Sequence, residues 1–184
     1  MTSVVIPLGN GSKQKNIELR YCLRSIEQYL TGVREVFIIG ECPDWVQNVI
    51  HIPATDDPRT RYRDRNIMQK MVTACKDNRV SNDFLMVHDD HLLLSEYDAG
   101  SFPYYYEGYI EPGEHQYGLT KANTIDLLCP DADNRLFNYD IHCPILFNKE
   151  RFIGTVPLAD WNKWYGYCLK TLYCILNGVQ GEQT

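Results

Sequence analysis

Residues 3–39, SVVIPLGNGSKQKNIELRYCLRSIEQYLTGVREVFII, are the stretch from which the fold class can be predicted. Residues 3–8 form an apolar run with β-branched side chains at its centre, and a glycine-bearing loop follows, which indicates a buried strand. Between residues 15 and 30, apolar side chains recur at spacings of three and four, the pattern of an amphipathic helix, and Gly32 ends it. The apolar run at residues 36–39 then predicts a second buried strand.

The sequence beyond this stretch continues to alternate between strand and helix patterns. Because the strands are continuously apolar, both faces of their sheet need cover. We therefore predict an α/β fold with one open sheet flanked by helices. The further elements are strands at residues 49–52, 84–87 and 139–147, helices at 64–75 and 161–176, the latter with Trp164 facing the core, and a loop with short strands at 97–120.

The composition is that of one globular domain. The chain has 184 residues, 44% of them apolar and 23% charged, which argues against disorder. The 18 basic and 24 acidic residues give a net charge of −6, which disfavours a nucleic acid as partner without excluding one. The seven cysteines show no CxxC spacing, and no apolar run is long enough for a membrane span or a signal peptide. We therefore expect a reduced, soluble, cytoplasmic protein.

The first candidate site follows the strand at residues 84–87, where His88, Asp89, Asp90 and His91 come in succession. Ligands of open α/β sheets bind outside the carboxyl ends of the strands. Adjacent carboxylates would repel each other there unless a cation lay between them. Carboxylate oxygens suit Mg²⁺ or Mn²⁺, and an imidazole shifts the preference toward Mn²⁺. The alternative is a solvated turn in which one aspartate caps the next segment.

The second candidate is the pair Asp140 and His142. On a strand over residues 139–147, alternation would send both side chains to one face. They could complete a metal site or supply a base beside one. The alternative is a histidine with a purely structural role.

The third candidate is a basic segment around the start of the predicted helix at residues 64–75. Arginines near a helix N-terminus form a ready phosphate site. The alternative is a solvated stretch that balances the neighbouring aspartates. Together with a divalent cation, a phosphate site would suit a nucleotide diphosphate compound. The residues of this segment are Arg59, Arg61, Arg63, Arg65, Asn66 and Lys70.

These motifs resemble those of the GT-A class of nucleotide-sugar glycosyltransferases, whose DXD motif holds Mn²⁺ or Mg²⁺ against the donor diphosphate. A closer likeness, over about residues 3–152, is to the Stealth family of sugar-phosphate transferases. It rests on NIELRYCLRSIE at residues 16–27, VFII at 36–39, PDW at 43–45, HDD at 88–90 and DIHCP at 140–144. Stealth proteins open with a strand that ends in Trp-Val-Asp, whereas this chain has IPLG at residues 6–9. That opening is more similar to ordinary GT-A enzymes.

The resemblance implies one GT-A-like domain over residues 1–184, built on an open, mixed, Rossmann-like sheet flanked by helices. Its nucleotide-binding half is at residues 1–91, and its acceptor and metal-completing half is at 92–184. It also implies roles for particular residues. Asp140 is the expected base if the reaction inverts the anomeric centre, with Asp160 as the alternative. The metal ligands that it implies are Asp90, Asp89 and His142. Asp89 is also expected to be catalytic, because it would contact the sugar. The nucleotide-binding residues that it implies are Pro7, Leu8, Gly9, Glu41, Arg65, Asn66 and Lys70.

We therefore expect a metal-dependent glycosyltransferase that moves a sugar from a nucleotide diphosphate sugar, UDP-linked, to a glycan or another hydroxyl acceptor. A Stealth-like hexose-1-phosphate transferase and a non-catalytic nucleotide-binding module are the alternatives. The chain is short for a GT-A enzyme. We therefore expect part of the acceptor region to be reduced or to come from a second protomer of a homo-oligomer.

Overall fold

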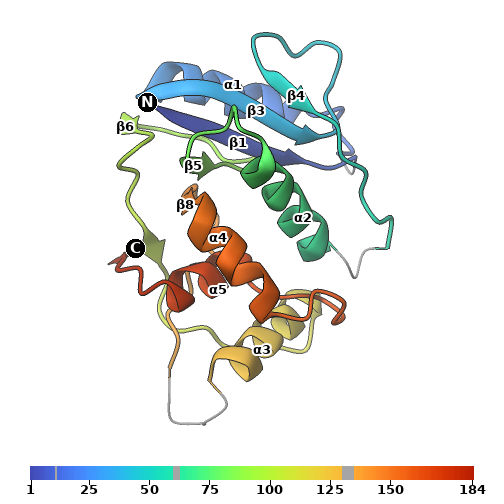
Figure 1. Cartoon of the computed structure of the whole chain (residues 1–184), viewed down its shortest axis with the longest axis vertical. Coiled ribbons are helices and arrows are strands. Elements are labelled where there is room, and N and C mark those ends of the chain that lie inside the picture. Colours follow the sequence, from blue (N-terminus) through green and yellow to red (C-terminus); the bar gives the residue numbers. More distant parts are fainter. Residues whose placement is uncertain (11, 60–62, 130–134) are drawn as a thin grey trace. The chain divides into compact units, whose positions relative to one another are not determined.

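The computed structural model describes residues 1–10, 12–59, 63–129 and 135–184 (Figure 1). These residues fall into two compact units, each formed from segments that are separated in the sequence. Unit 1 comprises Met1–Asp56, Lys70–Phe102 and His142–Glu150, and unit 2 comprises Asp57–Gln69, Pro103–Ile141 and Arg151–Thr184.

Unit 1 is built on a five-stranded sheet with the strand order β4-β3-β1-β5-β8. The first four strands are parallel to their neighbours, and β8 is antiparallel to β5. The predicted mixed sheet is therefore confirmed. Its strands are β1 (Thr2–Leu8), β3 (Val33–Gly40), β4 (Ile50–Ile52), β5 (Asp83–Met86) and β8 (Ile145–Asn148).

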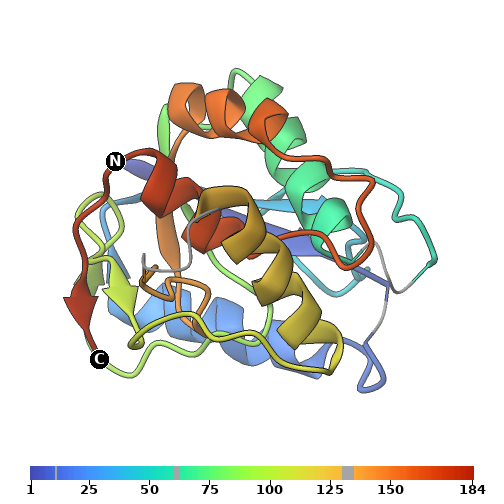
Figure 2. The same cartoon turned by 90° about the horizontal axis from the view of Figure 1, so that it is seen from below.

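Strand β1 lies at the centre of the sheet, and all seven of its residues are buried. Helix α1 (Ile17–Tyr29) covers one face of the sheet, and residues 70–76 of helix α2 (Arg63–Lys76) cover the other (Figure 2). Each fully buried aliphatic side chain of such a strand contributes about 1.5–3 kcal/mol. This two-sided burial explains why the strand sequences are continuously apolar, and it confirms an α/β sheet flanked by helices.

The connections of β1 and β5 create a switch point at the carboxyl edge of the sheet. The chain leaves β1 for β3 on one side, whereas β5 pairs with β1 on the other. Ligands of open α/β sheets bind in the crevice formed where the strand order reverses in this way. The carboxyl ends of β1 and β5 are therefore the part of unit 1 where a site is expected.

Unit 2 holds most of the residues beyond Phe102. Its core includes the buried side chains of Ile110, Cys129, Leu136 and Cys168. The remaining elements belong to unit 2, except for the short strands β2 and β6, which belong to unit 1. They are β2 (Leu30–Thr31), β6 (Tyr97–Asp98), β7 (Tyr105–Tyr106), α3 (Gln116–Leu128), α4 (Lys149–Thr155, whose first two residues belong to unit 1), the 3-10 helix η2 (Val156–Leu158), α5 (Leu169–Leu176) and β9 (Glu182–Gln183).

Two predicted elements are shorter than the sequence suggested. The strand expected at residues 139–147 is only β8, because Pro144 has no N–H for a ladder and the chain bends at residues 141–143. The helix expected at 161–176 is only α5, since Tyr165 and Gly166 have φ values of 68° and 53°, outside the helical region. Trp164, expected in the core, is 58% exposed.

Two α-helices of the described residues, α3 and α4, were not predicted from the sequence. The loop expected at residues 97–120 does contain β6 and β7, but α3 begins within it at Gln116. Helix α4, which follows β8 directly, was not predicted. Within the described part of the chain, no helix has both the length and the apolar character needed to cross a membrane.

Candidate functional site

The turn after β5 carries the acidic residues that the sequence analysis selected. Val87 completes the ladder by donating its N–H to the carbonyl of Val5 at 3.0 Å. The chain then turns, and the N–H of His91 donates to the carbonyl of His88 at 3.1 Å. The thiol of Cys22 on α1 contacts the same carbonyl at 3.4 Å. The turn is therefore held by both the central strand and the helix that covers the sheet.

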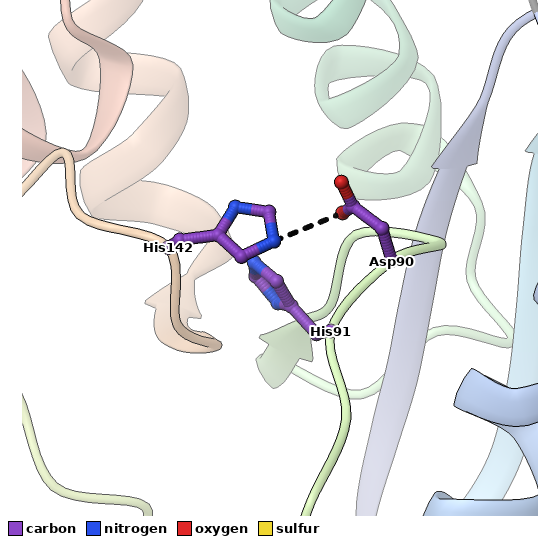
Figure 3. A group of neighbouring side chains, drawn as sticks. All are labelled: Asp90, His91 and His142. Carbon is purple, nitrogen blue, oxygen red and sulfur yellow. Dashed lines mark ion pairs between the residues drawn. The ribbon is translucent and has the colours of Figure 1, made fainter. Parts of the chain in front are cut away.

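His142 reaches this turn because β8 runs antiparallel to β5. Ile145, the first residue of β8, pairs with Met86, the last residue of β5. The segment just before β8 must therefore lie beside the segment just after β5. As a result Nε2 of His142 lies 3.3 Å from Oδ1 of Asp90 (Figure 3).

His91 completes this cluster as the third residue. The ligand-type atoms of Asp90, His91 and His142 all lie within 4.8 Å of one another. The rings of His91 and His142 meet edge to face at 4.6 Å between centroids (Figure 3). The cluster thus contains Asp90 and His142, two of the three expected metal ligands. Asp89 is not part of it.

His91 is the only buried member of the cluster, and its hydrogen bonding argues against a role as metal ligand. It is 3% exposed, and its Nδ1 accepts the backbone N–H of His88 at 3.2 Å. The neutral tautomer that accepts this hydrogen bond carries its proton on Nε2, and in that tautomer neither nitrogen offers a lone pair to a metal. The ring of His91 packs against the ring of His142 and so restricts the position of that exposed side chain.

Asp90 and His142 fit a divalent cation of the Mg²⁺ or Mn²⁺ type. Their side chains are 53% and 66% exposed, which leaves room for water and substrate oxygens. Mg²⁺ sites commonly use one or two carboxylates and take substrate phosphates as further ligands, and one imidazole favours Mn²⁺. Without His91 the set is too small for a structural zinc site, which needs four protein ligands.

Asp89 lies close enough to influence the thiol of Cys22. Burial raises the pKa of that thiol to about 12, and the negative charges of Asp89 and Asp90 add to the effect. The thiol is therefore protonated at neutral pH. Asp89 and Asp90 both contribute negative potential at the carboxyl end of β5.

The expected nucleotide-binding residues at the ends of β1 and β3 are neighbours. Pro7 pairs with Ile39, and Leu8 pairs with Gly40. The N–H of Glu41 then donates to the carbonyl of Leu8 at 3.2 Å. The side chains of Pro7 and Leu8 are buried, whereas Glu41 is exposed. Of these residues, Glu41 is therefore the one whose side chain can reach a ligand.

Two glycines allow the backbone to pack closely at this edge. A Cβ on Gly40, whose φ is +120°, would lie 2.0 Å from the carbonyl oxygen of Leu8 and 2.6 Å from Cε of Lys70. A Cβ on Gly9 would lie 3.1 Å from Oδ2 of Asp56. Glycine is thus required at position 40, and it brings Lys70 against the end of β3.

Lys70 is a buried cation at the edge of the sheet. It is 4% exposed, and its ammonium group forms an ion pair with Asp56. Lys70 was expected to bind the nucleotide, and Asp56 is one of the aspartates that the alternative interpretation of the basic segment balances. A buried lysine needs such a partner, since an unpaired ammonium group would be costly.

In unit 2, polar and basic side chains of the segment around the start of α2 bind to Asp57 of the same segment. The side-chain amide of Asn66 accepts the N–H of Asp57 at 3.1 Å and donates to its carbonyl at 2.9 Å. Arg59 pairs with the same aspartate and holds the pKa of that carboxyl well below its usual range. The contacts of Arg59 therefore agree with the alternative interpretation of this segment, in which its arginines balance neighbouring aspartates. Arg61 lies outside the described residues.

Asp140, the expected base, lies in a network within unit 2. The hydroxyl of Tyr117 donates to the backbone carbonyl of Asp140 at 2.7 Å and lies 3.4 Å from its Oδ2. The N–H of Asp140 donates to Oδ1 of Asn138 at 3.2 Å. Burial raises the pKa of the Cys168 thiol, and the charge of Asp140 raises it further. Asp140 therefore has a fixed backbone and ionisable neighbours.

Asp64 is a second carboxyl group in this network that the sequence analysis did not select. Burial and the charge of Asp140 raise the pKa of Asp64 to about 7. Its Oδ2 lies 3.4 Å from the hydroxyl of Thr120, which lies only 2.6 Å from the carbonyl of Tyr165. Since the hydroxyl has one proton and the shorter contact takes it, the longer contact suits a protonated Asp64.

Comparison with known proteins does not identify this site. The chain matches no model of a protein family, and it matches no curated protein.

Proposed function

We propose that the protein is a metal-dependent glycosyltransferase of the GT-A type, which transfers a sugar from a nucleotide diphosphate sugar, UDP-linked, to a glycan. The observation that supports this most directly is the meeting of Asp90 and His142, 3.3 Å apart, beyond the carboxyl end of β5. That position lies at the switch point of the sheet, where α/β proteins bind nucleotides.

The residues of unit 1 would bind the two ends of the donor. Asp90 and His142 would hold Mn²⁺ or Mg²⁺, with Asp89 beside them contacting the sugar. When bound, the metal supplies Lewis-acid neutralisation of the diphosphate leaving group. Glu41 and the backbone of Gly9 would line the nucleoside pocket.

Lys70 would contribute to the donor site as a cation of fixed position. It is paired with Asp56 but keeps further N–H donors on its ammonium group, which has three. In unit 2, Arg65 and Asn66 remain the residues proposed for contact with ribose or phosphate. Asn66 would have to do this beside its bonds to Asp57.

Asp140 is the proposed base for an inverting reaction. It would accept the proton of the acceptor hydroxyl as that oxygen attacks the anomeric carbon. Tyr117 holds the backbone of Asp140 through the 2.7 Å hydrogen bond. A retaining reaction would not need this base.

The identity of the nucleotide that is released tests the proposal. The full chain is incubated with Mn²⁺, a panel of UDP-sugars and glycan acceptors, and the released nucleotide is identified by anion-exchange chromatography. Release of UDP means glycosyl transfer, and release of UMP means hexose-1-phosphate transfer. Mn²⁺-dependent binding without release of either nucleotide, even by donor hydrolysis, means a non-catalytic binding module.

A further inference from the structure

A cavity of about 690 Å³ lies in unit 1, apart from the residues of the candidate site. It is lined by helix α1, by the start of β3 and by the loop from Trp45 to Val49. Small-molecule pockets in proteins have volumes of about 300–1,000 Å³. The cavity is therefore large enough for a ligand of its own.

The part of the lining that comes from α1 has a charged side and an apolar side. Arg20, Arg24 and Glu27 follow one another at spacings of four and three, so they lie on one face of the helix. The apolar lining comes from the neighbouring face and from the strand and loop. Those side chains are Leu23, Ile26, Leu30, Val33, Val36 and Val49.

Arg20 is held in place by an aromatic ring. Its guanidinium carbon lies 4.6 Å from the centroid of the Trp45 ring. Such stacking uses the face of the guanidinium group, whereas its N–H donors lie in the plane of the group. The edge of Arg20 therefore remains suited to a carboxylate or phosphate, which arginine binds with paired hydrogen bonds.

In the part of the chain that the structure describes, no acidic side chain forms an ion pair with either arginine of this face. Among the described residues, Arg34, Arg59 and Arg79 each form an ion pair with a carboxylate, whereas Arg20 and Arg24 form none. This is unexpected in a chain whose net charge is −6. Two such guanidinium groups beside an apolar cavity are complementary to a ligand with one anionic end.

We propose that this cavity binds an amphipathic anion, namely an apolar chain that ends in a carboxylate or a phosphate. Arg20 and Arg24 hold the anionic head, and the aliphatic side chains of the cavity hold the chain. Glu27 lies one turn beyond Arg24 and disfavours a second negative charge on the ligand. This inference does not depend on the proposed transferase activity.

Four probes with the same ten-carbon chain test the proposal by titration calorimetry with the full chain. They are decanoate, decyl phosphate, decanol and decyltrimethylammonium. We expect both anions to bind at least tenfold more tightly than decanol, and the cation to bind most weakly. The tighter of the two anions identifies the source of the ligand as a carboxylic acid or a lipid phosphate.

Three single charge changes locate the binding. Arg24→Gln should weaken decanoate binding at least tenfold and leave decanol binding unchanged. Glu27→Gln should strengthen decanoate binding about two- to fivefold, since it removes a nearby like charge. Arg34→Gln is the matched control, because Arg34 lies on β3 but does not line the cavity, and it should bind like the parent protein.

All three variants alter charged side chains at exposed positions, so we expect each of them to fold. Circular dichroism tests whether they do. Opposite effects of the two changes in the cavity support the proposal. It is overturned if no anion binds, if decanol binds as tightly as decanoate, or if Arg24→Gln and Arg34→Gln behave alike.

Discussion

Nε2 of His142 lies 3.3 Å from Oδ1 of Asp90, although one residue precedes β8 and the other follows β5. The antiparallel direction of β8 produces this meeting, because it places the start of one strand beside the end of the other. The two side chains come from different segments, so a cation between them would also tie those segments together.

The metal assignment predicts that Asp90 and His142 are both needed for Mn²⁺-dependent binding of UDP. Asp90→Ala and His142→Ala should each weaken that binding at least tenfold, because each removes one of few protein ligands. Calorimetry with and without Mn²⁺ measures the effect. His115→Ala, a change of an exposed histidine in unit 2, is the control; if it weakened binding as much, the assignment would be wrong.

The role of Asp140 as base predicts a loss of transfer without a matching loss of donor binding. Asp140→Asn keeps the shape and the contact to Tyr117 but cannot accept a proton, so we expect transfer to fall at least about a hundredfold. Donor affinity should change less than threefold. Steady-state rates and calorimetry test this together, and equal losses in both would make Asp140 a binding or structural residue.

The raised pKa of Asp64 predicts a pH-dependent stability. The folded state holds this proton up to about pH 7, whereas an aspartate in the unfolded chain loses it near its ordinary pKa of 3.8. The contribution of Asp64 to the free energy of unfolding is therefore fully present at low pH, and it is lost as the pH rises through about 4 to 7. Asp64→Asn should stabilise the protein by about 2 kcal/mol at about pH 8 and have no effect at about pH 4.

Thermal unfolding at several pH values tests the prediction for Asp64. Asp126→Asn is the matched control, because Asp126 is an exposed acid on α3 whose contact with Lys163 is 3.7 Å. An exposed pair of this kind contributes little. A stabilisation by Asp64→Asn that did not depend on pH would contradict the explanation.

The backbone packing at the end of β3 predicts that Gly40 cannot be replaced. Gly40→Ala should cost about 3 kcal/mol of unfolding free energy, since the new Cβ would lie 2.0 Å from a backbone oxygen at a φ of +120°. Gly154→Ala in α4 is the control, because a Cβ there meets nothing within 4 Å. That change should be neutral or stabilising by up to about 1 kcal/mol. Urea unfolding compares the two.

The buried ion pair predicts a non-additive pair of substitutions. Lys70→Met should destabilise unit 1 by about 3 kcal/mol, because it leaves Asp56 beside an apolar side chain. Adding Asp56→Asn should recover part of that loss, since the uncompensated charge disappears. Lys76→Met, at an exposed position of the same helix, should change stability by less than about 0.5 kcal/mol. A double variant no more stable than Lys70→Met would contradict the pairing.

Much of the sheet could be predicted from the sequence, and Asp90 and His142, which the structure brings together, were among the expected metal ligands. The apolar runs at residues 3–8, 36–39 and 84–87 became β1, β3 and β5 because a strand buried on both faces has to be continuously apolar. The order of polar residues after β5 likewise suggested Asp90, since ligands gather at carboxyl ends of strands. His142 was selected as well, but by an alternation argument that does not apply, because its segment is not a strand.

Other features carried no readable sequence pattern. Helix α3 has no clear apolar stripe to mark it, and its Gly118 is required only because the backbone of Gly113 lies 2.4 Å from where its Cβ would be. The electrostatic interaction between Asp64 and Asp140 involves two residues that are far apart in the sequence. Neither contact is visible before the chain is folded.

Local chemistry thus determines which segments of this protein become strands and helices, because burial and backbone geometry act on neighbouring residues. The direction of β8, the pairing of Lys70 with Asp56 and the approach of His142 to Asp90 depend on folding of the whole unit. They bring together groups from separate segments, and such contacts are selected by packing and charge in three dimensions rather than by spacing along the chain.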